Sequence, residues 1–119
     1  MDLHAFIQEY TDDVYHRHDP EAAARFIADP CLRHEHGHRV VMSLDENKAR
    51  ISSFLDQAGD VRFEYAATVA EGELYAAAYE VSFELNGKET TRSGIEIFRV
   101  RDGKIVETWN SAAGEGPWG

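Results

Sequence analysis

The chain has 119 residues, a length that predicts a single domain over residues 1–119. Its composition is 43% hydrophobic and 29% charged, which is typical of a globular protein and excludes a disordered or collagen-like chain. The 22 acidic residues outnumber the 12 Lys and Arg residues and give a formal charge of −10. Such a surface repels phosphate backbones and anionic lipids, so we expect no nucleic-acid partner and no membrane partner.

Two further features bear on the compartment. Cys31 is the single cysteine, so it cannot close an intrachain disulfide or build a cysteine-based zinc site. The N-terminus lacks a basic leader followed by an apolar run, and no segment reaches the ~20 apolar residues of a membrane span. We therefore expect a soluble, cytoplasmic protein.

Two helices are predicted at the N-terminal end. The first follows Asp2, a helix-capping residue type, and its apolar residues follow the three-four spacing of one buried face. These residues are Leu3, Phe6, Ile7, Tyr10 and Val14. The second helix begins at Asp19, where a proline and a glutamate in the first turn are favourable, and it must end before Pro30.

A third helix is predicted after residue 43, because Ser43 and Glu46 have the spacing of a capping box. Its apolar side consists of Leu44, Ile51, Phe54 and Leu55. Between the second and third helices, residues 31–43 predict a short strand, a turn at Gly37 and a second apolar segment.

From residue 61 onward the pattern changes to strands. Glycine-containing turn signals divide this part of the chain into four runs. Two of these turn signals, Asn86-Gly87 and Asp102-Gly103, are strong hairpin signals. The runs cover residues 61–70, 73–85, 88–101 and 104–111. Long antiparallel strands after three helices predict an α+β domain, with the helices on one face of a curved sheet.

A two-residue turn at Asn86-Gly87 determines which side chains share a face of the sheet. It pairs Tyr79 with Gly94 and Ala77 with Glu96. Glu96 then lies on a largely apolar face with Tyr75, Tyr79, Val81 and Phe83. A carboxylate in that position is unfavourable unless it is paired, protonated or hydrated.

The turn at Asp102-Gly103 allows two registers. A two-residue loop would set Glu96 opposite Trp109, whereas a three-residue loop would set it opposite Thr108. We favour the second register, because it gathers the apolar residues Ile95, Ile97, Ile105 and Trp109 on the outer face. That face is apolar enough to form a homodimer interface through Ile95, Ile97 and Trp109.

The run from Ser93 to Trp109, SGIEIFRVRDGKIVETW, resembles the C-terminal signature of SnoaL-like domains. The preceding helices fit the same order, so the resemblance covers nearly the whole chain. These domains belong to the nuclear transport factor two-like superfamily. The resemblance implies a cone-shaped, curved antiparallel sheet wrapped around three N-terminal helices, with an internal pocket. The superfamily includes ketosteroid isomerases, polyketide cyclases, dehydratases, epoxide hydrolases and members without chemistry.

Ketosteroid isomerase offers a comparison residue by residue. Matching the hairpin at Asn86-Gly87 places that family's oxyanion-hole aspartate on Glu96, which is one methylene longer. The tyrosine of its first helix falls on Tyr10. Its catalytic base lies on the first strand, at a position that falls on His34 or Glu35.

The sequence leaves the choice of base open. Inward alternation of Leu32, His34 and His36 would favour His34, whereas the chemistry of a carboxylate base favours Glu35. The neighbouring His38 follows Gly37, which interrupts the strand, so these histidines are not expected to form a metal site.

Structural interpretations compete with these chemical ones. Glu96 is either an acid of raised pKa or a satisfied buried group, and an ion pair with Arg92 on the same face would keep it ionised. Tyr10 on an amphipathic helix also suits a hydrophobic core.

We expect a pocket that binds a hydrophobic small molecule carrying a carbonyl or hydroxyl group. The resemblance implies cofactor-free proton abstraction next to a carbonyl, as in isomerases, cyclases and dehydratases. The candidate catalytic residues are His34, Glu35, Glu96 and Tyr10, and the candidate substrate-binding residues are Tyr79, Phe98, Thr108, Asn110 and His36. The alternatives are a non-catalytic ligand-binding or dimerisation module, and an epoxide hydrolase with two facing carboxyl groups.

Overall fold

The computed structural model describes all 119 residues. α1 (Leu3–Tyr10) continues into a π-helical segment, η1 (Thr11–His16), and a 3-10 helix, η2 (Pro20–Arg25), follows it. α2 (Leu44–Ala58) separates the first two strands from the others. The strands are β1 (Ile27–Glu35), β2 (His38–Met42), β3 (Arg62–Glu71), β4 (Leu74–Leu85), β5 (Lys88–Arg101) and β6 (Lys104–Glu115).

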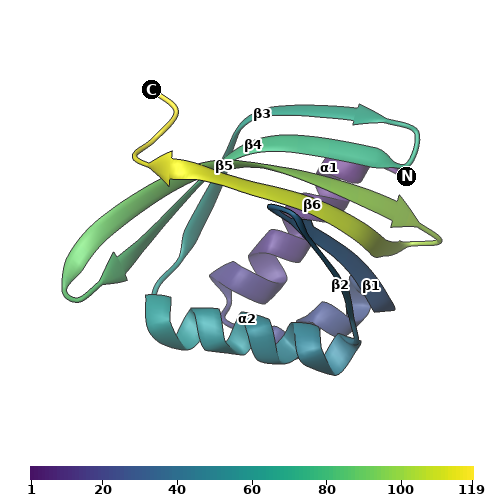
Figure 1. Ribbon diagram of the computed structural model, residues 1–119, viewed down its shortest axis with the longest axis horizontal. Helices are drawn as coiled ribbons and strands as arrows, with labels where there is room; N and C mark the ends of the chain where they lie inside the picture. The colour runs from purple at the N-terminus through teal and green to yellow at the C-terminus, as the bar shows by residue number, and fades with distance from the viewer.

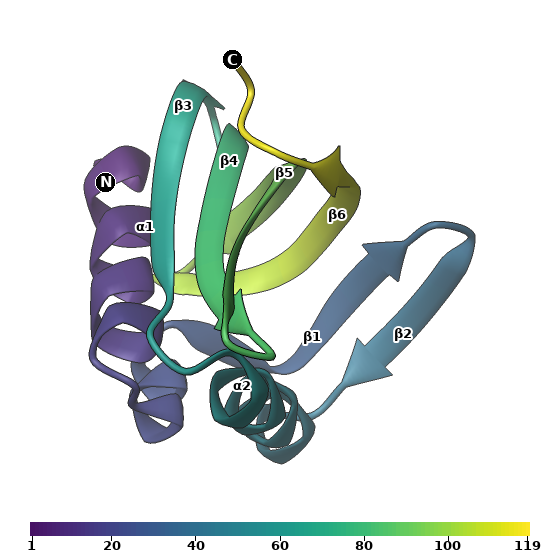
Figure 2. The ribbon, with the colours of Figure 1, turned by 90° about the vertical axis from the view of Figure 1, so that its left-hand side faces the viewer.

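All strands belong to one six-stranded sheet of order β2-β1-β6-β5-β4-β3. Neighbouring strands are antiparallel except for β1 and β6, which run parallel. The sheet is curved but not closed, and the helices lie on its concave side (Figure 1). In Figure 2, α1 stands at one side, α2 lies beneath the sheet, and the β1–β2 hairpin extends away on the side opposite α1. This arrangement confirms the predicted α+β cone. Neither α-helix combines the length and the apolar character needed to span a membrane.

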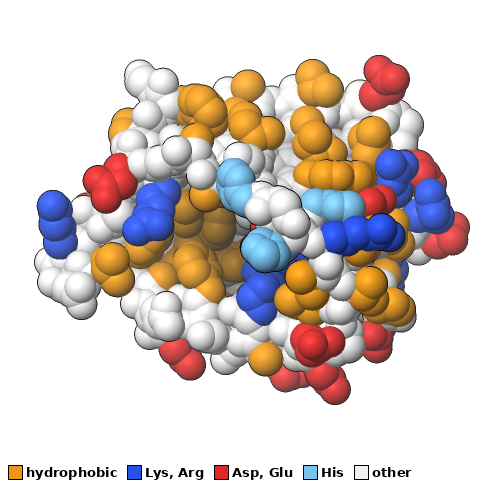
Figure 3. Space-filling view, in the orientation of Figure 1, with side chains coloured by type: hydrophobic (Ala, Val, Ile, Leu, Met, Phe, Trp, Pro, Cys, Tyr) orange, Lys and Arg blue, Asp and Glu red, His pale blue; other side chains and the backbone are white.

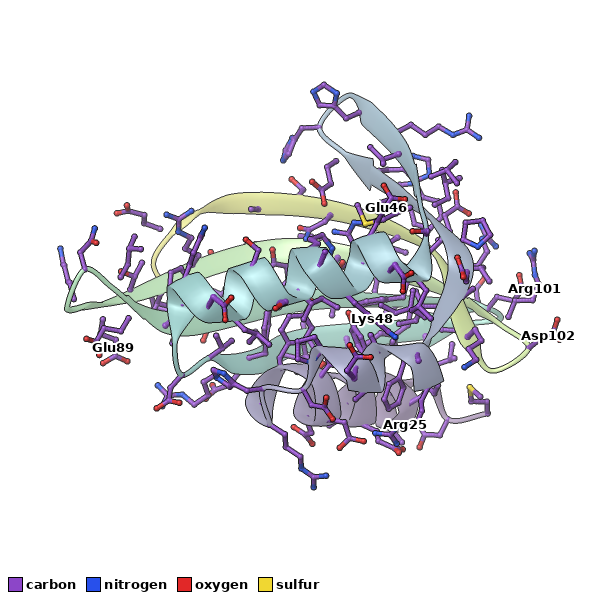
Figure 4. The ribbon with its side chains drawn as sticks, turned by 90° about the horizontal axis from the view of Figure 1, so that it is seen from below. Arg25, Glu46, Lys48, Glu89, Arg101 and Asp102 are labelled. Carbon is purple, nitrogen blue, oxygen red and sulfur yellow. The ribbon has the colours of Figure 1, made fainter.

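α2 begins where the capping box predicts. The Ser43 hydroxyl accepts a hydrogen bond from the Glu46 backbone N–H (3.1 Å), and the Glu46 carboxylate accepts one from the Ser43 backbone N–H (2.9 Å). Lys48 lies on the side of α2 that faces the N-terminal helical segments (Figure 4), where it donates to the Glu21 carboxylate of η2 at 3.0 Å. The capping box sets where α2 begins, and its buried residues Ile51 and Leu55 pack the helix into the hydrophobic core.

The second predicted helix is shorter than expected. Its helical part ends at Arg25, and β1 already begins at Ile27. The Ile105 backbone N–H donates to the Phe26 carbonyl (2.7 Å), so pairing with β6 replaces the expected last helical turn. Pro30 lies inside β1, at a shift in the pairing with β6, as expected for a residue that cannot donate to the ladder.

The predicted pairing of β4 with β5 is confirmed. Tyr79 lies opposite Gly94, and Ala77 lies opposite Glu96. A Cβ atom at position 94 would lie 2.5 Å from the Tyr79 hydroxyl. A glycine is therefore required for the Tyr79 side chain to lie across β5.

The predicted pairing of β5 with β6 is wrong in both alternatives. The turn is a two-residue turn that pairs Arg101 with Lys104, but Val106 is then bulged out of the ladder, and Glu96 lies opposite Asn110. The bulge turns both Ile105 and Thr108 towards the core, which a regular strand could not do for residues three apart. Ile105 is therefore buried rather than part of the outer face.

Candidate functional site

A cavity of about 240 Å³ lies between the concave face of the sheet and the helices. This volume corresponds to roughly eight water molecules at ~30 Å³ each, so it can hold a small organic molecule. In Figure 3, hydrophobic side chains line a hollow between α2 and the long strands, beside the β1–β2 hairpin. Most of the lining residues are hydrophobic. The polar ones are Thr11, Arg33, Glu35, Asn47, Arg50, Glu96, Thr108 and Asn110.

The cavity brings together most of the residues that the sequence nominated. Tyr10, Glu35, Tyr79, Glu96, Phe98, Thr108 and Asn110 all line it. His34 and His36 do not; both lie at a separate surface depression near the tip of the β1–β2 hairpin.

Of the two alternatives for β1, the structure supports the one in which Glu35 faces the cavity, and His34 points the other way. His34 stacks on Trp109 with ring centroids 5.1 Å apart, and its Nε2 lies 2.8 Å from the Glu107 carboxylate on the outer face. The reason is the parallel pairing with β6, which sets His34 beside the outward-facing Trp109 and Arg33 beside the inward-facing Thr108. The first strand therefore directs Arg33 into the cavity.

Glu96 reaches the cavity from the middle of β5, between Ala77 of β4 and Asn110 of β6. Arg92 does not pair with it, because the Arg92 guanidinium lies over the ring of Phe83 (5.9 Å). Burial raises the pKa of Glu96 to about 7, against the opposing effect of two cavity arginines and with a small contribution from Glu35. The carboxyl group is therefore largely protonated below pH 7.

Glu35 lies in the same cavity with the opposite pKa shift. Arg33 donates from Nη2 to its carboxylate at 2.6 Å, and this hydrogen bond holds the pKa of Glu35 below its usual value. Its side chain is 51% exposed, so it lies at the mouth of the cavity. The cavity thus combines an ionised carboxylate and a neutral carboxylic acid, an arrangement that separates the roles of base and acid.

Tyrosine hydroxyls complete the polar part of the cavity. Tyr79 donates to the Asn110 side-chain oxygen at 3.1 Å, and burial raises the pKa of Tyr79 to about 12. The hydroxyls of Tyr10 and Tyr15 are 3.4 Å apart, and burial raises the pKa of Tyr10. Tyr10 also packs edge-on against Phe98, so it belongs both to the core and to the cavity wall. The raised pKa values keep the hydroxyls of Tyr10 and Tyr79 protonated, so both can donate hydrogen bonds.

The sequence analysis missed the two cavity arginines. Arg33 was not expected because the sequence left open which face of β1 is the inner one. Arg50 comes from α2, where Asn47, Arg50 and Phe54 follow a three-four spacing that could have indicated a common face. Arg50 donates from Nε and Nη2 to the Asn47 side-chain oxygen, both at 3.3 Å.

Comparison with known proteins shows the family to which this chain belongs. A family model described as the SnoaL-like domain matches residues 7–108. The chain belongs to the SnoaL-like domain family. The match begins in α1 and ends in β6, so it includes every lining residue of the cavity except Asn110.

Solved structures show that this SnoaL-like chain has the nuclear transport factor two-like fold. A protein from Acidithiobacillus ferrooxidans, proposed to be a polyketide cyclase, superposes with a TM-score of 0.82 at 16% identity, over 92% of this chain and 86% of the other. A SnoaL-like polyketide cyclase from Agrobacterium tumefaciens gives 0.81 at 16% identity, over 94% and 91%. AclR from Streptomyces galilaeus, proposed to be a hydroxylase, gives 0.75 at 20% identity, over 91% and 86%. No curated protein matches the chain in sequence.

Proposed function

We propose that this SnoaL-like domain binds a small hydrophobic molecule with a carbonyl group and catalyses proton transfer at the adjacent carbon, without a cofactor. Isomerisation, aldol cyclisation and dehydration all use this step. The observation that carries the proposal is the presence of Glu35 and Glu96, with opposite pKa shifts, in one largely apolar cavity. The structural likeness to polyketide cyclases is compatible with it.

Strand register supports the division of roles. Asn110 lies beside Glu35 on one side and beside Glu96 on the other, so the three residues form one row across the sheet. Two interstrand spacings of ~4.8 Å separate the backbones of Glu35 and Glu96 by about 10 Å, which leaves room for a ligand between the two carboxyl groups. In this arrangement, the ionised Glu35 takes the proton from the carbon, while protonated Glu96 donates a hydrogen bond to the carbonyl oxygen.

The proton balance of the step is closed within the cavity. The C–H electron pair moves into the enolate, the proton resides on Glu35, and its return to a different carbon completes an isomerisation. In a cyclisation the enolate carbon instead attacks a second carbonyl, and the alkoxide formed as that carbonyl π bond breaks takes the proton from Glu35. Asn110 and the Tyr79 hydroxyl that donates to it orient the ligand.

Epoxide hydrolysis is a second candidate that the same two carboxyl groups favour. Glu35 would accept a proton from water as the water attacks an epoxide carbon, and Glu96 would protonate the oxygen that leaves that carbon. The net change is the addition of one water molecule to give a diol. Both groups line the cavity, as this reaction also requires.

Two substrates in parallel test these functions. The first is 4-acetylbenzamide in D₂O, with proton NMR following the loss of the methyl signal next to the ketone. The second is styrene oxide, with diol formation followed by chromatography. We expect methyl exchange at least about a hundredfold faster than in protein-free buffer, the usual gain from a positioned base. Diol formation without exchange would favour the epoxide hydrolase, and ligand binding with neither reaction would overturn a catalytic role.

The outer face of the sheet supports a proposal about assembly. Trp109, Ile97, Ala76 and Val69 follow one another across β6, β5, β4 and β3, and Ile95 lies in the next row. Ile95 is 39% exposed and Val69 is 67% exposed, so this apolar row is open to solvent in the monomer. We propose that a second copy of the chain covers it, because monomers rarely expose contiguous apolar surfaces of this kind.

A charge placed in this row is expected to dissociate the dimer. Ile95→Lys would bury an unpaired ammonium in the interface and raise the dimer dissociation constant by at least about tenfold, as measured by sedimentation equilibrium. Leu85→Lys is the matched control, since Leu85 is 40% exposed but lies at the tip of the β4–β5 hairpin. A monomeric wild-type protein, or equal weakening by both variants, would contradict the proposed interface.

A further inference from the structure

The cavity contains more positive charge than the proposed reaction uses. Arg33 is paired with Glu35, but no ion pair involves Arg50, whose guanidinium donates to the neutral side chain of Asn47. Glu96 balances this charge only when it is ionised. Arg50 is partly buried, and a partly buried guanidinium without an anionic partner is unfavourable because its desolvation is not repaid by Coulomb attraction. The remaining charge therefore favours an anionic ligand group.

Two buried polar atoms beside these arginines lack partners. They are Nδ2 of Asn47 and Oγ1 of Thr108, and neither forms a hydrogen bond within the protein. Asn47 is 1% exposed and Thr108 is 3% exposed, and both line the cavity. Buried donors are nearly always satisfied, so these two groups point to a ligand that accepts hydrogen bonds from them. A carboxylate has two oxygens and about four acceptor sites, which suits several donors at once.

The strand register places two of these groups, Arg33 and Thr108, at a defined distance from the reacting groups. Arg33 lies beside Thr108 in one row across the sheet, and Glu35 lies beside Asn110 in the next inward-facing row. Successive inward-facing residues of a strand are separated by about 7 Å. A carboxylate bound at the first row would leave a carbonyl at the second row, and a single six-membered ring spans this separation.

We propose that the ligand of this cavity is a small apolar keto acid whose carboxylate binds to Arg50, Asn47 and Thr108, with Arg33 beside it. This inference rests on the proposed function and names its substrate class. The carboxylate anchors the molecule, and the ketone lies between Glu35 and Glu96. The apolar remainder of the ligand contacts Phe54, Phe63 and Val81 of the cavity wall.

The test compares 4-acetylbenzoate with 4-acetylbenzamide, which has the same shape and the same ketone but no charge. Calorimetry on the wild-type protein is expected to show at least about tenfold tighter binding of the carboxylate, the usual gain from charge-assisted hydrogen bonds. Arg50→Gln is expected to remove this preference, because it weakens binding of the carboxylate far more than binding of the amide. Arg62→Gln is the matched control, because it removes the same charge from an exposed position outside the cavity.

Thr108→Val keeps the test decisive if Arg50→Gln does not fold. This variant removes an unpaired hydroxyl and retains the side-chain shape, so the protein should remain folded, with several-fold weaker binding of the carboxylate and a smaller loss for the amide. Equal affinity of the wild-type protein for the two compounds, or a preference that is undiminished in every variant that folds, would overturn the inference. Proton exchange separates it from the proposed function. If both ketones exchange protons but the carboxylate does not bind more tightly, the proposed function is supported and the keto acid inference is wrong. If the carboxylate binds more tightly but neither ketone exchanges, the anion site is supported and the proposed function is wrong.

Discussion

Glu35→Gln is expected to slow methyl-proton exchange of the bound ketone by at least about a hundredfold, because an amide cannot accept the proton from carbon. Glu35 lines the cavity, and its hydrogen bond with Arg33 keeps the carboxylate ionised. The measurement is the rate of deuterium incorporation into 4-acetylbenzamide at saturating ligand. Glu35→Asp retains a carboxylate and should recover part of the rate. A structural role for Glu35 would predict no such difference between the two variants.

His34→Gln is the matched control for this experiment. His34 is adjacent to Glu35 in β1, but it lies on the outer face with Trp109 and Glu107. The exchange rate should therefore stay at the wild-type level in this variant. Loss of exchange in His34→Gln, together with normal exchange in Glu35→Gln, would assign the base to the histidine and contradict the proposed mechanism.

The position of Glu96 could be predicted because its determinants are local. A two-residue Asn86-Gly87 turn sets the pairing of the strands on either side of it, and the two-residue period of a strand then assigns each side chain to a face. This pairing alone predicts that the side chains of Glu96, Tyr79 and Phe98 lie on the inner face, and all three line the cavity.

The orientation of β1 could not be predicted in the same way. Its inner face depends on parallel pairing with β6, more than 70 residues away in the sequence. The pattern of the strand itself is ambiguous, since both Arg33 and His34 are polar. The same long-range pairing extends β1 back to Ile27 and limits the preceding helix to Pro20–Arg25. Tertiary contacts here override local helix signals.

The bulge in β6 could not be predicted from the local sequence either. No glycine or proline marks Val106, and the bulge forms because both Ile105 and Thr108 are buried. Its consequence is chemical, because it moves Asn110 next to Glu96. The row of Glu35, Asn110 and Glu96 exists only with this one-residue shift.

Glu96 is expected to set the alkaline limit of the reaction. Its pKa of about 7 is higher than that of an ordinary glutamate, so the donating, protonated form is present below pH 7 and is lost above it. The ionised form cannot donate to the carbonyl oxygen, and its charge opposes that of the developing enolate. The wild-type exchange rate should therefore fall as the pH rises through about 7. Glu96→Ala should lower the rate by about a hundredfold or more at pH 6, the usual effect of removing an oxyanion donor.

The Glu96→Gln variant distinguishes two roles for Glu96. In one, protonated Glu96 donates a hydrogen bond to the carbonyl oxygen; in the other, ionised Glu96 is the base that removes the proton from carbon. The amide N–H donates a hydrogen bond and does not titrate, so this variant should retain measurable exchange, with a rate that no longer falls near pH 7. If Glu96 instead removed the proton from carbon, the wild-type rate would rise with pH through about 7, and Glu96→Gln would be inactive at every pH. The sign of the pH dependence thus decides which of the two carboxyl groups donates a proton and which accepts one. The exchange rate of Glu35→Gln shows how much activity remains when the proposed base is absent.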